Sequence, residues 1–314
     1  MAMAILNSPA QWIAHFGDAR KPTAVTIGNF DGVHVGHQKI LRGVIERALA
    51  MDAVSSVLTF FPHPARVLRP DVAPCLLETL PQRLAEFATM GIDATLMLKF
   101  DQDLAKLSAE EFARKFLVET LRARAVLVGA NFRFGHKQAG DVKLLEEFGR
   151  KNGFAVEIVE PVLVDGLVVS SSAIRAAVRE GRIDDARRML GRPFALAGEI
   201  RSGTGMGRKL VVPTLNLATE QETLPNNGVY ATEVVIAGKC YRAVTNVGVR
   251  PTFNGQQLAI ESHLFDFSET LTSGPMTVKF YARLRDEQKF SGPDALREQI
   301  LQDIARAKEL FATR

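Results

Sequence analysis

Cysteine is scarce in this sequence of 314 residues, where Cys75 and Cys240 are the only two and lie far apart. Two isolated thiols support neither a disulfide framework nor a cysteine-based metal site, and they fit a reducing cytoplasm. No apolar run of about 18 residues is present, so we expect no membrane-spanning helix. The first residues also lack the cationic and apolar regions of an export signal.

Charge is not concentrated in any one segment. The formal net charge is +4, but basic residues are dispersed and no long block of like charge occurs. We therefore expect neither nucleic acid nor a membrane as a partner, and small phosphorylated molecules explain the basic excess more economically. With 46% apolar and 24% charged residues the composition is that of a globular protein, and the length suffices for two hydrophobic cores.

The first part of the chain alternates strand-like and helix-like segments. Ser108 with Glu111 forms a capping box, Asp141 can cap a later helix, and Gly91 and Gly153 are placed to end theirs. The expected strands are 23–27, 53–60, 94–100, 125–129 and 154–159, and a helix is expected over 35–51. This alternation predicts an α/β, Rossmann-like domain, in which ligands bind beyond the carboxyl ends of parallel strands.

The second part changes to a two-residue alternation, typical of antiparallel strands. Strands are expected at 194–200, 230–236, 240–247, 258–265 and 276–284, followed by an amphipathic helix over 293–311. This pattern predicts an antiparallel β-barrel with a terminal helix packed on it, joined to the first part by a linker near 191–193. The predicted fold class is therefore α/β plus β.

Two histidines follow the first strand. Segment 28–37 reads Gly-Asn-Phe-Asp-Gly-Val-His-Val-Gly-His, which places His34 and His37 in an H-x-G-H motif where the next helix begins. The glycines let the backbone approach a ligand, the helix N-terminus offers unpaired N–H groups, and the imidazoles add donors for phosphate oxygens. The combination predicts a site that stabilises charge on an α-phosphate as pyrophosphate leaves. The alternative is a polar helix face or a pair of zinc ligands.

Further loops carry polar residues after later strands. His63 lies between two prolines after the second strand, Asn131 follows the fourth, and a Ser-Ser-Ser-Ala-Ile-Arg run follows the fifth. In that run Ser171, Ser172 and Arg175 open a helix and can hold phosphate, or they are a helix cap and a surface charge. Because the carboxyl ends of parallel strands share one edge, we expect these loops to meet in one crevice.

The second half contains a glycine-rich loop and two groups of oxygen ligands. The loop 203–209 reads Gly-Thr-Gly-Met-Gly-Arg-Lys, which either wraps phosphate or is a flexible surface loop. Thr214 and Asn216 place a hydroxyl and a carbonyl oxygen on one side of an extended chain, which suits a magnesium ion that keeps several waters. Glu261 alternates with apolar residues, so it lies at the barrel rim or has a partner, and it can accept a proton from a substrate hydroxyl.

Together these motifs resemble a known enzyme family over nearly the whole chain. The first half resembles the nucleotidylyltransferase superfamily in segments 28–37, 131–135 and 171–175. The second half is similar to riboflavin kinases in the glycine loop and in segments 213–216, 227–230, 246–253, 261–263 and 285–290. The chain as a whole therefore resembles the prokaryotic bifunctional riboflavin kinase/FAD synthetases.

That resemblance implies an FMN adenylyltransferase domain over residues 1–185 and a riboflavin kinase domain over 186–314, which use ATP and Mg²⁺ and hold FMN and FAD as products. It implies that His34 and His37 act in adenylyl transfer, that Glu261 is the kinase base, and that Thr214 and Asn216 bind magnesium. The other expected contacts to ATP or flavin are Gly28, Phe30, Asp31, Gly32, Asn131, Ser171, Ser172 and Arg175 in the first domain, and Gly203, Gly205, Gly207, Arg208, Asn246 and Arg285 in the second.

One departure and two alternative functions accompany the resemblance. The family usually reads Leu-Gly-Phe-Pro-Thr-Ala-Asn where this chain has Leu-Val-Val-Pro-Thr-Leu-Asn at 210–216, and loss of the glycine stiffens the loop. A single-activity adenylyl- or cytidylyltransferase with a regulatory barrel has no need of Thr214, Asn216 and Glu261. A non-enzymatic flavin carrier needs neither the histidine turn nor a magnesium pair. The sequence leaves the oligomeric state open.

Overall fold

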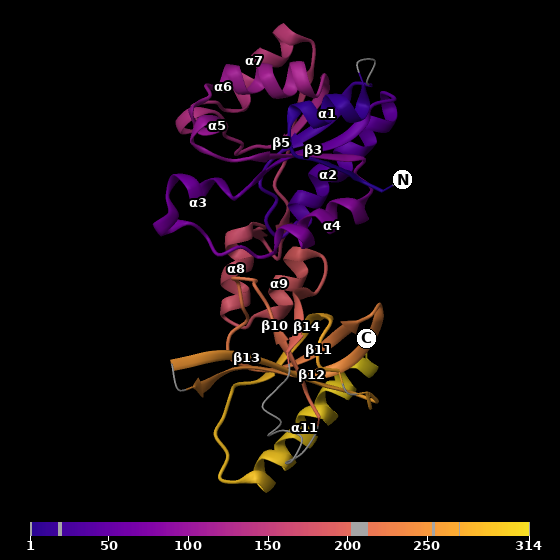
Figure 1. The fold of residues 1–314 in the computed structure, drawn as a ribbon, viewed down its shortest axis with the longest axis vertical. Coiled ribbons are helices and arrows are strands. Elements are labelled where there is room, and N and C mark those ends of the chain that lie inside the picture. The colour runs from indigo at the N-terminus through magenta and orange to yellow at the C-terminus, as the bar shows by residue number, and fades with distance from the viewer. Residues whose placement is uncertain (1, 18–20, 202–212, 253–254, 270, 314) are drawn as a thin grey trace. The chain divides into compact units, whose positions relative to one another are not determined.

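The computed structural model describes residues 2–17, 21–201, 213–252, 255–269 and 271–313. The chain forms two compact units (Figure 1). The first comprises Met1–Cys75 and Leu80–Val169, and the second comprises Leu76–Thr79 and Ser170–Arg314. The division of the chain into a parallel α/β unit and an antiparallel β unit confirms the fold class predicted from the sequence.

The first unit is built on a six-stranded sheet in which every neighbouring pair is parallel. In spatial order the strands are β1 (Ala4–Leu6), β4 (Ala94–Lys99), β3 (Val54–Phe61), β2 (Thr23–Ile27), β5 (Ala123–Gly129) and β6 (Ala155–Val159). The five strands expected from the sequence are present with ends shifted by two residues at most. The short edge strand β1 and the helix after it were not expected, because three residues carry too little periodicity to be recognised.

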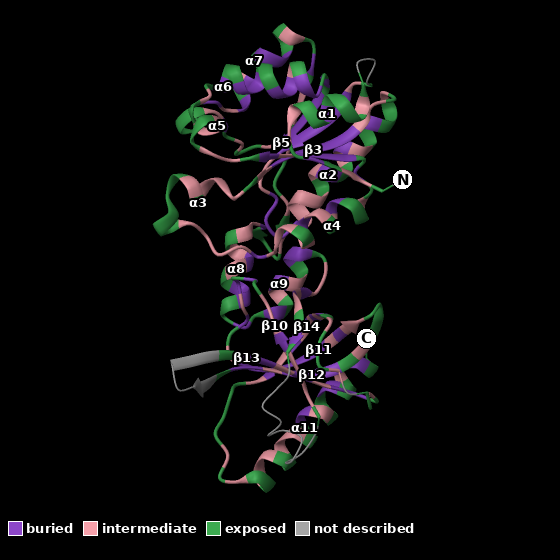
Figure 2. Cartoon of the chain, in the orientation of Figure 1, coloured by how far each residue is buried: buried purple, intermediate pink, exposed green. Residues whose placement is uncertain are grey.

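Helices cover both faces of this sheet, and the buried strands lie between them (Figure 2). Alternate strand residues point to opposite faces, so Val25 packs in one core with Trp12 while Ala24 packs in the other with Phe87. The helices are α1 (Pro9–Phe16), α2 (Val35–Ala50), α3 (Pro64–Leu68), α4 (Leu80–Met90), α5 (Gln102–Lys106), α6 (Ala109–Phe112), a π-helical segment (Ala113–Thr120) and α7 (Val142–Asn152). A small hairpin, β7 (Leu163–Val164) with β8 (Leu167–Val168), ends the unit.

The predicted helix signals are present as hydrogen bonds. Ser108 and Glu111 form the capping box in both directions. Asp141 accepts from the backbone N–H of Leu144, and Gly153 ends α7 in the left-handed conformation.

The second unit contains a closed antiparallel barrel of six strands. Around the barrel the order is β10 (Leu215–Ala218), β13 (Gly255–Leu264), β12 (Lys239–Thr252), β11 (Gly228–Ile236), β14 (Pro275–Arg285) and β9 (Phe194–Arg201). Helix α11 (Pro293–Ala312) packs on the outside through Ala307 and Phe311 against Val229 and Ala231. The barrel and its helix follow the prediction with two differences. The four-residue strand β10 was anticipated only as extended chain, and strands β12 and β13 run on to Thr252 and Gly255, beyond the predicted ends at 247 and 258.

A row of three hydroxyl groups marks the inside of the barrel. Thr245 lies 2.7 Å from Thr232 and 2.8 Å from Ser262, oxygen to oxygen, and all three side chains are completely buried. They come from three adjacent strands, and Thr232 alternates along β11 with the residues that contact α11. Because side chains alternate along a strand, Thr232, Thr245 and Ser262 point into the barrel and the residues directly before and after each of them point outward.

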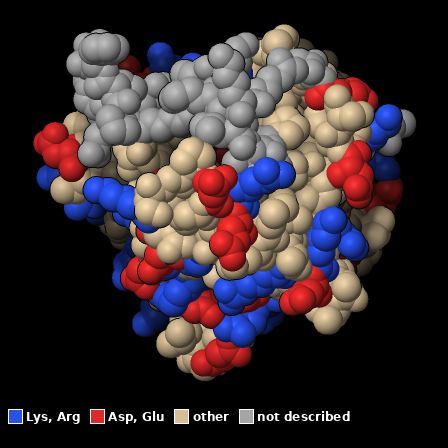
Figure 3. Space-filling view, turned by 90° about the horizontal axis from the view of Figure 1, so that it is seen from below, with Lys and Arg blue, Asp and Glu red and all other residues tan. Residues whose placement is uncertain are grey.

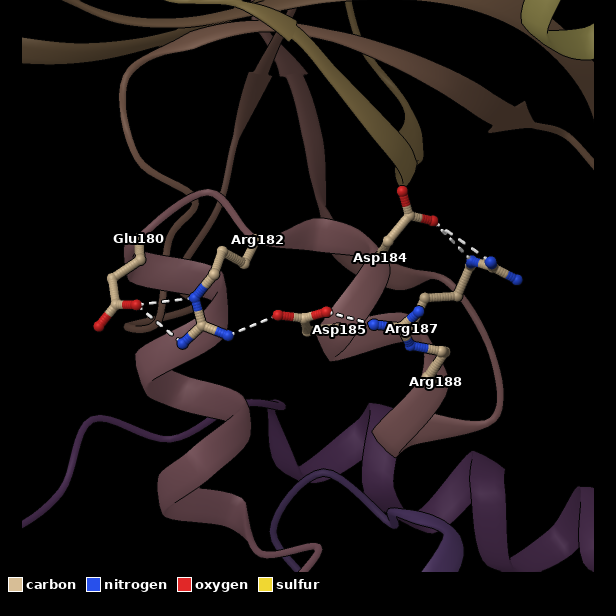
Figure 4. A network of polar contacts seen from close by, with 6 residues as sticks. All are labelled: Glu180, Arg182, Asp184, Asp185, Arg187 and Arg188. Atoms are coloured by element: carbon tan, nitrogen blue, oxygen red, sulfur yellow. Dashed lines mark hydrogen bonds and ion pairs between the residues drawn. The ribbon is translucent and has the colours of Figure 1, made fainter. Parts of the chain in front are cut away.

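Helices α8 (Ser171–Arg179) and α9 (Ile183–Leu190) also belong to the second unit. Arg182 binds Glu180 and Asp185 at the start of α9, and the series continues along the helix through Arg188 (Figure 4). The hydrogen bond from Arg182, followed by the nearby cations, lowers the pKa of Asp185. Acids in the first turn and arginines in the last suit the helix dipole, and such exposed pairs stabilise only modestly.

On the face shown in Figure 3, Lys and Arg side chains are interspersed with Asp and Glu side chains. Among the described residues, no helix combines the length and the apolar character needed to cross a bilayer.

Candidate active sites

The order of the strands locates a ligand crevice in the first unit. The chain passes from β2 to β3 and β4 on one side, and β5 then returns to the other side of β2. In open parallel sheets ligands bind at such a switch point, beyond the carboxyl ends of the two strands. Segment 28–37 follows β2 and segment 130–140 follows β5, so the sheet brings these two predicted loops together.

The turn after β2 has an unusual backbone conformation. Phe30, Gly32 and Val33 have φ values of 52°, 84° and 32°. The Phe30 ring is buried and contacts both His37 and Phe87 edge to face, at 5.0 and 5.6 Å between centroids. Non-glycine residues hold such φ values only where their surroundings enforce them, and strain of this kind concentrates at functional sites. Asp31 is likewise buried within the turn.

His34 both caps a helix and fixes its own tautomer. It is the N-cap residue of α2, and its Nδ1 accepts from the backbone N–H of His37 at 3.3 Å. Because an accepting Nδ1 carries no proton, neutral His34 carries its proton on Nε2, which makes that atom a donor. The same residue therefore completes the helix start and supplies a polar group to the turn.

His37 is held as a neutral group. Its ring stacks on that of His34, with centroids 3.6 Å apart and planes inclined by 18°. Burial lowers the pKa of His37 well below the usual 6.5, and the charges of His34 and then Arg83 lower it further. A stacked pair of imidazolium ions would be strongly repelled, whereas a neutral ring can donate a hydrogen bond to a developing anion.

Arg83 braces the histidine turn and was not predicted from the sequence. It lies on α4, is 4% exposed, and donates from Nη1 to the backbone oxygen of Asn29 in the turn. A recognisable signal was present, because Arg83 shares a helix face with the buried Phe87 four positions later. A cation on an apolar helix face needs a specific reason, and here it braces the histidine turn.

Two polar atoms of the turn are enclosed without a hydrogen-bond partner among the described residues. They are Nδ1 of His37 and the side-chain oxygen of Asn29. Buried polar groups are normally paired, and exceptions indicate a ligand or functional strain. The turn thus fits a polar ligand: Nδ1 of His37, when it carries the proton, can donate to a phosphate oxygen, whereas the oxygen of Asn29 accepts from a donor group.

The loop after β5 is a bend closed by backbone hydrogen bonds between Phe134 and Gly140. Phe134 is buried in the core, pairs through its backbone with Gly140, and stacks on Phe132 at 5.4 Å. Gly135 has φ of 74°, and a Cβ atom there would come within 2.6 Å of the backbone of Ala109. Asn131 is exposed at the start of this bend, on the side where the chain leaves β5.

The serine motif is a helix start within the second unit. The N-cap of α8 is Ser170, whose hydroxyl accepts from the N–H of Ala173 at 3.2 Å. Ser171 and Ser172 are therefore the first helical residues, and Arg175 donates to the hydroxyl of Ser172 at 3.0 Å. Because this helix groups with the barrel, the meeting of this motif with the histidine turn stays a prediction. His63 is also a cap, since its Nδ1 accepts from the N–H of Ala65 in α3.

In the barrel, Glu261 lies between two asparagines. The strand register pairs Glu261 with Asn216 on one side and with Asn246 on the other. Directly opposed residues share a face, and the inward direction of the adjacent Ser262 places these three side chains on the outer face. This explains how a carboxylate is accommodated on a barrel strand: it lies outside the core.

The oxygen ligands on this face fit a magnesium ion. Asn216 and Glu261 are directly opposed in the register, and Thr214 lies two residues before Asn216, so an extended chain at this point would bring its hydroxyl to the same face. Hard oxygen donors with few carboxylates are the ligands that Mg²⁺ takes while keeping several waters. The described residues contain no cluster of three or more His, Cys, Asp or Glu that suits a metal ion.

The remaining predicted kinase residues divide into two groups. One group lies outside the described residues and comprises Gly203, Gly205, Gly207 and Arg208. Val211 and Val212, where the chain differs from the usual family sequence, also lie outside them. Arg285 is described, and its guanidinium forms a bidentate ion pair with the buried Asp303 of α11, with N–O distances of 2.8 to 3.0 Å. Its visible function is to tie the terminal helix to the barrel.

Two further side chains adjoin this face and were not assigned from the sequence. Glu287 lies against Gly248, where a Cβ atom would collide with its carboxylate, and it accepts from the side chain of Asn227 at 3.4 Å. His263, two residues after Glu261, lies with Nδ1 3.0 Å from the backbone oxygen of Pro213. Both lie in segments that carry the family resemblance, 261–263 and 285–290, but only the tertiary contacts show what each side chain touches.

Comparisons with known proteins match a protein family to each half of the chain. A family model described as FAD synthetase matches residues 17–173, and one described as riboflavin kinase matches residues 190–311. A bifunctional riboflavin kinase/FMN adenylyltransferase of Pseudomonas fluorescens is 41% identical over 288 residues, which cover 91% of this chain and 92% of that protein. The Escherichia coli K12 protein of the same description is 36% identical over 288 residues, with the same coverage.

A solved structure extends the likeness to the whole fold. It is titled a macrolide-efflux protein from Streptococcus pneumoniae, is 26% identical, and superposes with a TM-score of 0.85 over 98% of this chain and 99% of that one. The two-unit architecture is thus shared along the full length.

Proposed function

Because this chain belongs to the bifunctional riboflavin kinase/FMN adenylyltransferase family, we propose that its two chemical steps are carried by the two sites described above. The enzyme phosphorylates riboflavin with ATP to give FMN and adenylylates FMN with ATP to give FAD and pyrophosphate. We assign adenylyl transfer to the histidine turn and phosphoryl transfer to the outer barrel face around Glu261. The observation that carries this assignment is the occurrence of two chemically different polar sites in separate compact units.

In the adenylyl transfer, a phosphate oxygen of FMN attacks the α-phosphorus of ATP while the bond to the β-phosphate breaks and pyrophosphate leaves. No covalent intermediate with the protein is needed, so the residues bind and stabilise charge. Nε2–H of His34 and the ring of His37 donate to the oxygens that gain charge, with the N-terminus of α2 behind them. Gly28, Phe30, Asp31 and Gly32 shape the turn that receives the nucleotide.

We also propose that the start of α8 binds phosphate through Ser171, Ser172 and Arg175. Asn131 is proposed as a polar contact after β5. A helix N-terminus with two hydroxyls and a guanidinium suits the outgoing pyrophosphate. The proposed functional boundary stays at 185/186, which differs from the end of the first compact unit at Val169 because α8 and α9 pack with the barrel.

In the phosphoryl transfer, a riboflavin hydroxyl attacks the γ-phosphorus of ATP, its proton passes to Glu261, and ADP leaves. Asn216 and Asn246, opposite Glu261 in the register, orient the carboxylate and contact the substrates. Thr214 and Asn216 would hold Mg²⁺, which neutralises phosphate charge when bound. Gly203, Gly205, Gly207 and Arg208 are proposed to wrap the phosphates, and Arg285 is proposed to contact ATP or flavin.

The proposed setting is the cytoplasm, where the free thiols Cys75 and Cys240 remain reduced. The proposed ligands are ATP, riboflavin, FMN and Mg²⁺, without nucleic acid or membrane partners.

The test separates the two steps in the full-length protein. Riboflavin and Mg-ATP are incubated with the protein, and FMN and FAD are separated by chromatography. His37→Ala should lower FAD formation about 10²- to 10³-fold and leave FMN formation unchanged. Glu261→Gln should lower FMN formation from riboflavin about 10²- to 10⁴-fold and leave FAD formation from added FMN unchanged. His15→Ala, on the exposed surface of α1, is the control. Any variant that impairs the other step instead would refute the assignment.

A further inference from the structure

His263 lies beside the segment that leads into the proposed metal ligands. The β10–β13 ladder pairs Asn216 with Glu261 and Leu215 with Ser262, and then it ends. Continued by one residue, this register places Thr214 opposite His263. His263 is two residues from Glu261 along β13, so it shares the outer face with the carboxylate and the proposed ligands.

The described contact is made with the residue before Thr214. Nδ1 of His263 lies 3.0 Å from the backbone oxygen of Pro213. A carbonyl oxygen only accepts, so Nδ1 carries the proton and donates. The oxygen of Pro213 and the N–H of Thr214 belong to one planar peptide unit, and fixing one fixes the plane from which the Thr214 side chain projects.

This contact is important because, among the residues that the structure describes, the β10–β13 ladder pairs none before Leu215 and so does not hold Thr214. Strand β10 has four residues, and Thr214 lies before its first residue. Proline donates no backbone hydrogen bond, so Pro213 cannot extend the ladder by itself. A side-chain donor from the neighbouring strand supplies the missing restraint at this position.

We propose that His263 is a positioning residue for phosphoryl transfer: by donating from Nδ1 to Pro213, it holds Thr214 beside Asn216 and in register with Glu261. The inference rests on the proposed role of Thr214 and Asn216 as magnesium ligands. Groups that orient metal ligands without touching the metal commonly change metal affinity about 10- to 100-fold when removed. His263 then sets how readily the magnesium pair is assembled, while Glu261 continues to accept the proton.

The test uses three substitutions that differ in where a donor lies. The Asn amide nitrogen occupies about the place of imidazole Nδ1, the Gln amide nitrogen that of Nε2, and Ala has no donor. His263→Asn should therefore preserve the contact, while His263→Gln and His263→Ala should lose it. His136→Ala removes an equivalent Nδ1 contact, 3.0 Å from the oxygen of Ala105 in the first unit, and is the matched control.

Two measurements are made on the full-length protein. The first is hydrogen–deuterium exchange of the 214–217 amides without metal or nucleotide, where Ala and Gln should exchange about tenfold faster and Asn should resemble the unsubstituted protein. The second is the Mg²⁺ concentration that gives half-maximal FMN formation, which Ala and Gln should raise about tenfold, with the rate at saturating Mg²⁺ largely recovered. The His136 variant should change neither quantity.

The outcomes distinguish a failure of the role proposed for His263 from a failure of the proposed magnesium ligands. If Thr214→Ala raises the Mg²⁺ requirement but His263→Ala changes neither measurement, His263 does not position the segment. Equal effects of Asn and Ala would also overturn it, because the donor at Nδ1 would then not be the cause. If Thr214→Ala leaves the Mg²⁺ requirement unaltered, the proposed metal pair falls and this inference falls with it.

Discussion

The amide nitrogen of Gln221 donates to the backbone oxygen of Leu77, 144 positions earlier in the chain, at 2.9 Å. The same side chain donates to Ala195 and accepts from the N–H of Ala197, so one glutamine joins segment 76–79 to β9. Leu77 is 1% exposed, and Glu78 forms an ion pair with Arg192. Four residues that lie within the first half of the sequence are thereby part of the barrel unit.

Leu77→Ala should therefore destabilise the barrel unit. The loss of a fully buried leucine side chain costs about 2–5 kcal/mol in free energy of unfolding. Hydrogen exchange of the barrel strands should accelerate more than that of the parallel sheet. Leu68→Ala, at a half-exposed position on α3, is the control and should change stability by less than about 0.5 kcal/mol. Selective loss of protection in the parallel sheet would contradict the grouping of Leu77 with the barrel.

The lowered pKa of His37 makes stability depend on pH in a defined direction. Below its ordinary pKa of 6.5 the unfolded chain binds a proton at His37, while the folded protein does not until a much lower pH. The unfolded state thus binds more protons in that window, and the free energy of unfolding falls as the pH falls below about 6.5. His37→Gln should reduce this slope in urea titrations between pH 7.5 and 5.5, and His15→Gln should not. Equal slopes for all three proteins would show that His37 titrates normally.

Arg83→Leu should loosen the histidine turn and change the titration of His37. Removing the cation removes one cause of the lowered pKa, so the pKa of His37 should rise when followed by NMR, although burial and His34 still hold it below 6.5. The backbone oxygen of Asn29 loses its donor, which costs about 1–3 kcal/mol. FAD formation should fall while FMN formation persists. An unchanged His37 titration would rule out this coupling.

Gly135→Ala should disrupt the loop after β5. Two effects add there, because the residue has φ of 74° and a Cβ atom would meet the backbone of Ala109. Gly91→Ala is a matched control, with φ of 90° and nothing within 4 Å of the added atom, so it carries the conformational cost alone. We expect about 1 kcal/mol of destabilisation at Gly91 and clearly more at Gly135, measured by thermal unfolding. Equal losses at the two positions would show that the Ala109 contact is unimportant.

Local patterns in the sequence determined most of the architecture. Apolar runs and two-residue alternation located the long strands, because side-chain period and burial are properties of neighbouring residues. The H-x-G-H motif after β2 and the Thr214–Asn216 pair were visible for the same reason, since a strand end or an extended chain places nearby residues in a known relation. Caps such as Ser108 with Glu111 were readable because their hydrogen bonds span three residues.

Tertiary structure decided whatever depends on residues distant in sequence. The bracing of Asn29 by Arg83, the contact of His263 with Pro213 and the inclusion of Leu77 in the barrel unit each join segments about 50 or more positions apart. The affiliation of α8 with the barrel and the pairing of Arg285 with Asp303, 18 positions later on another element, likewise depend on tertiary packing. Such contacts leave no periodicity in the sequence, because they are selected by which faces the folded strands and helices bring together and bury.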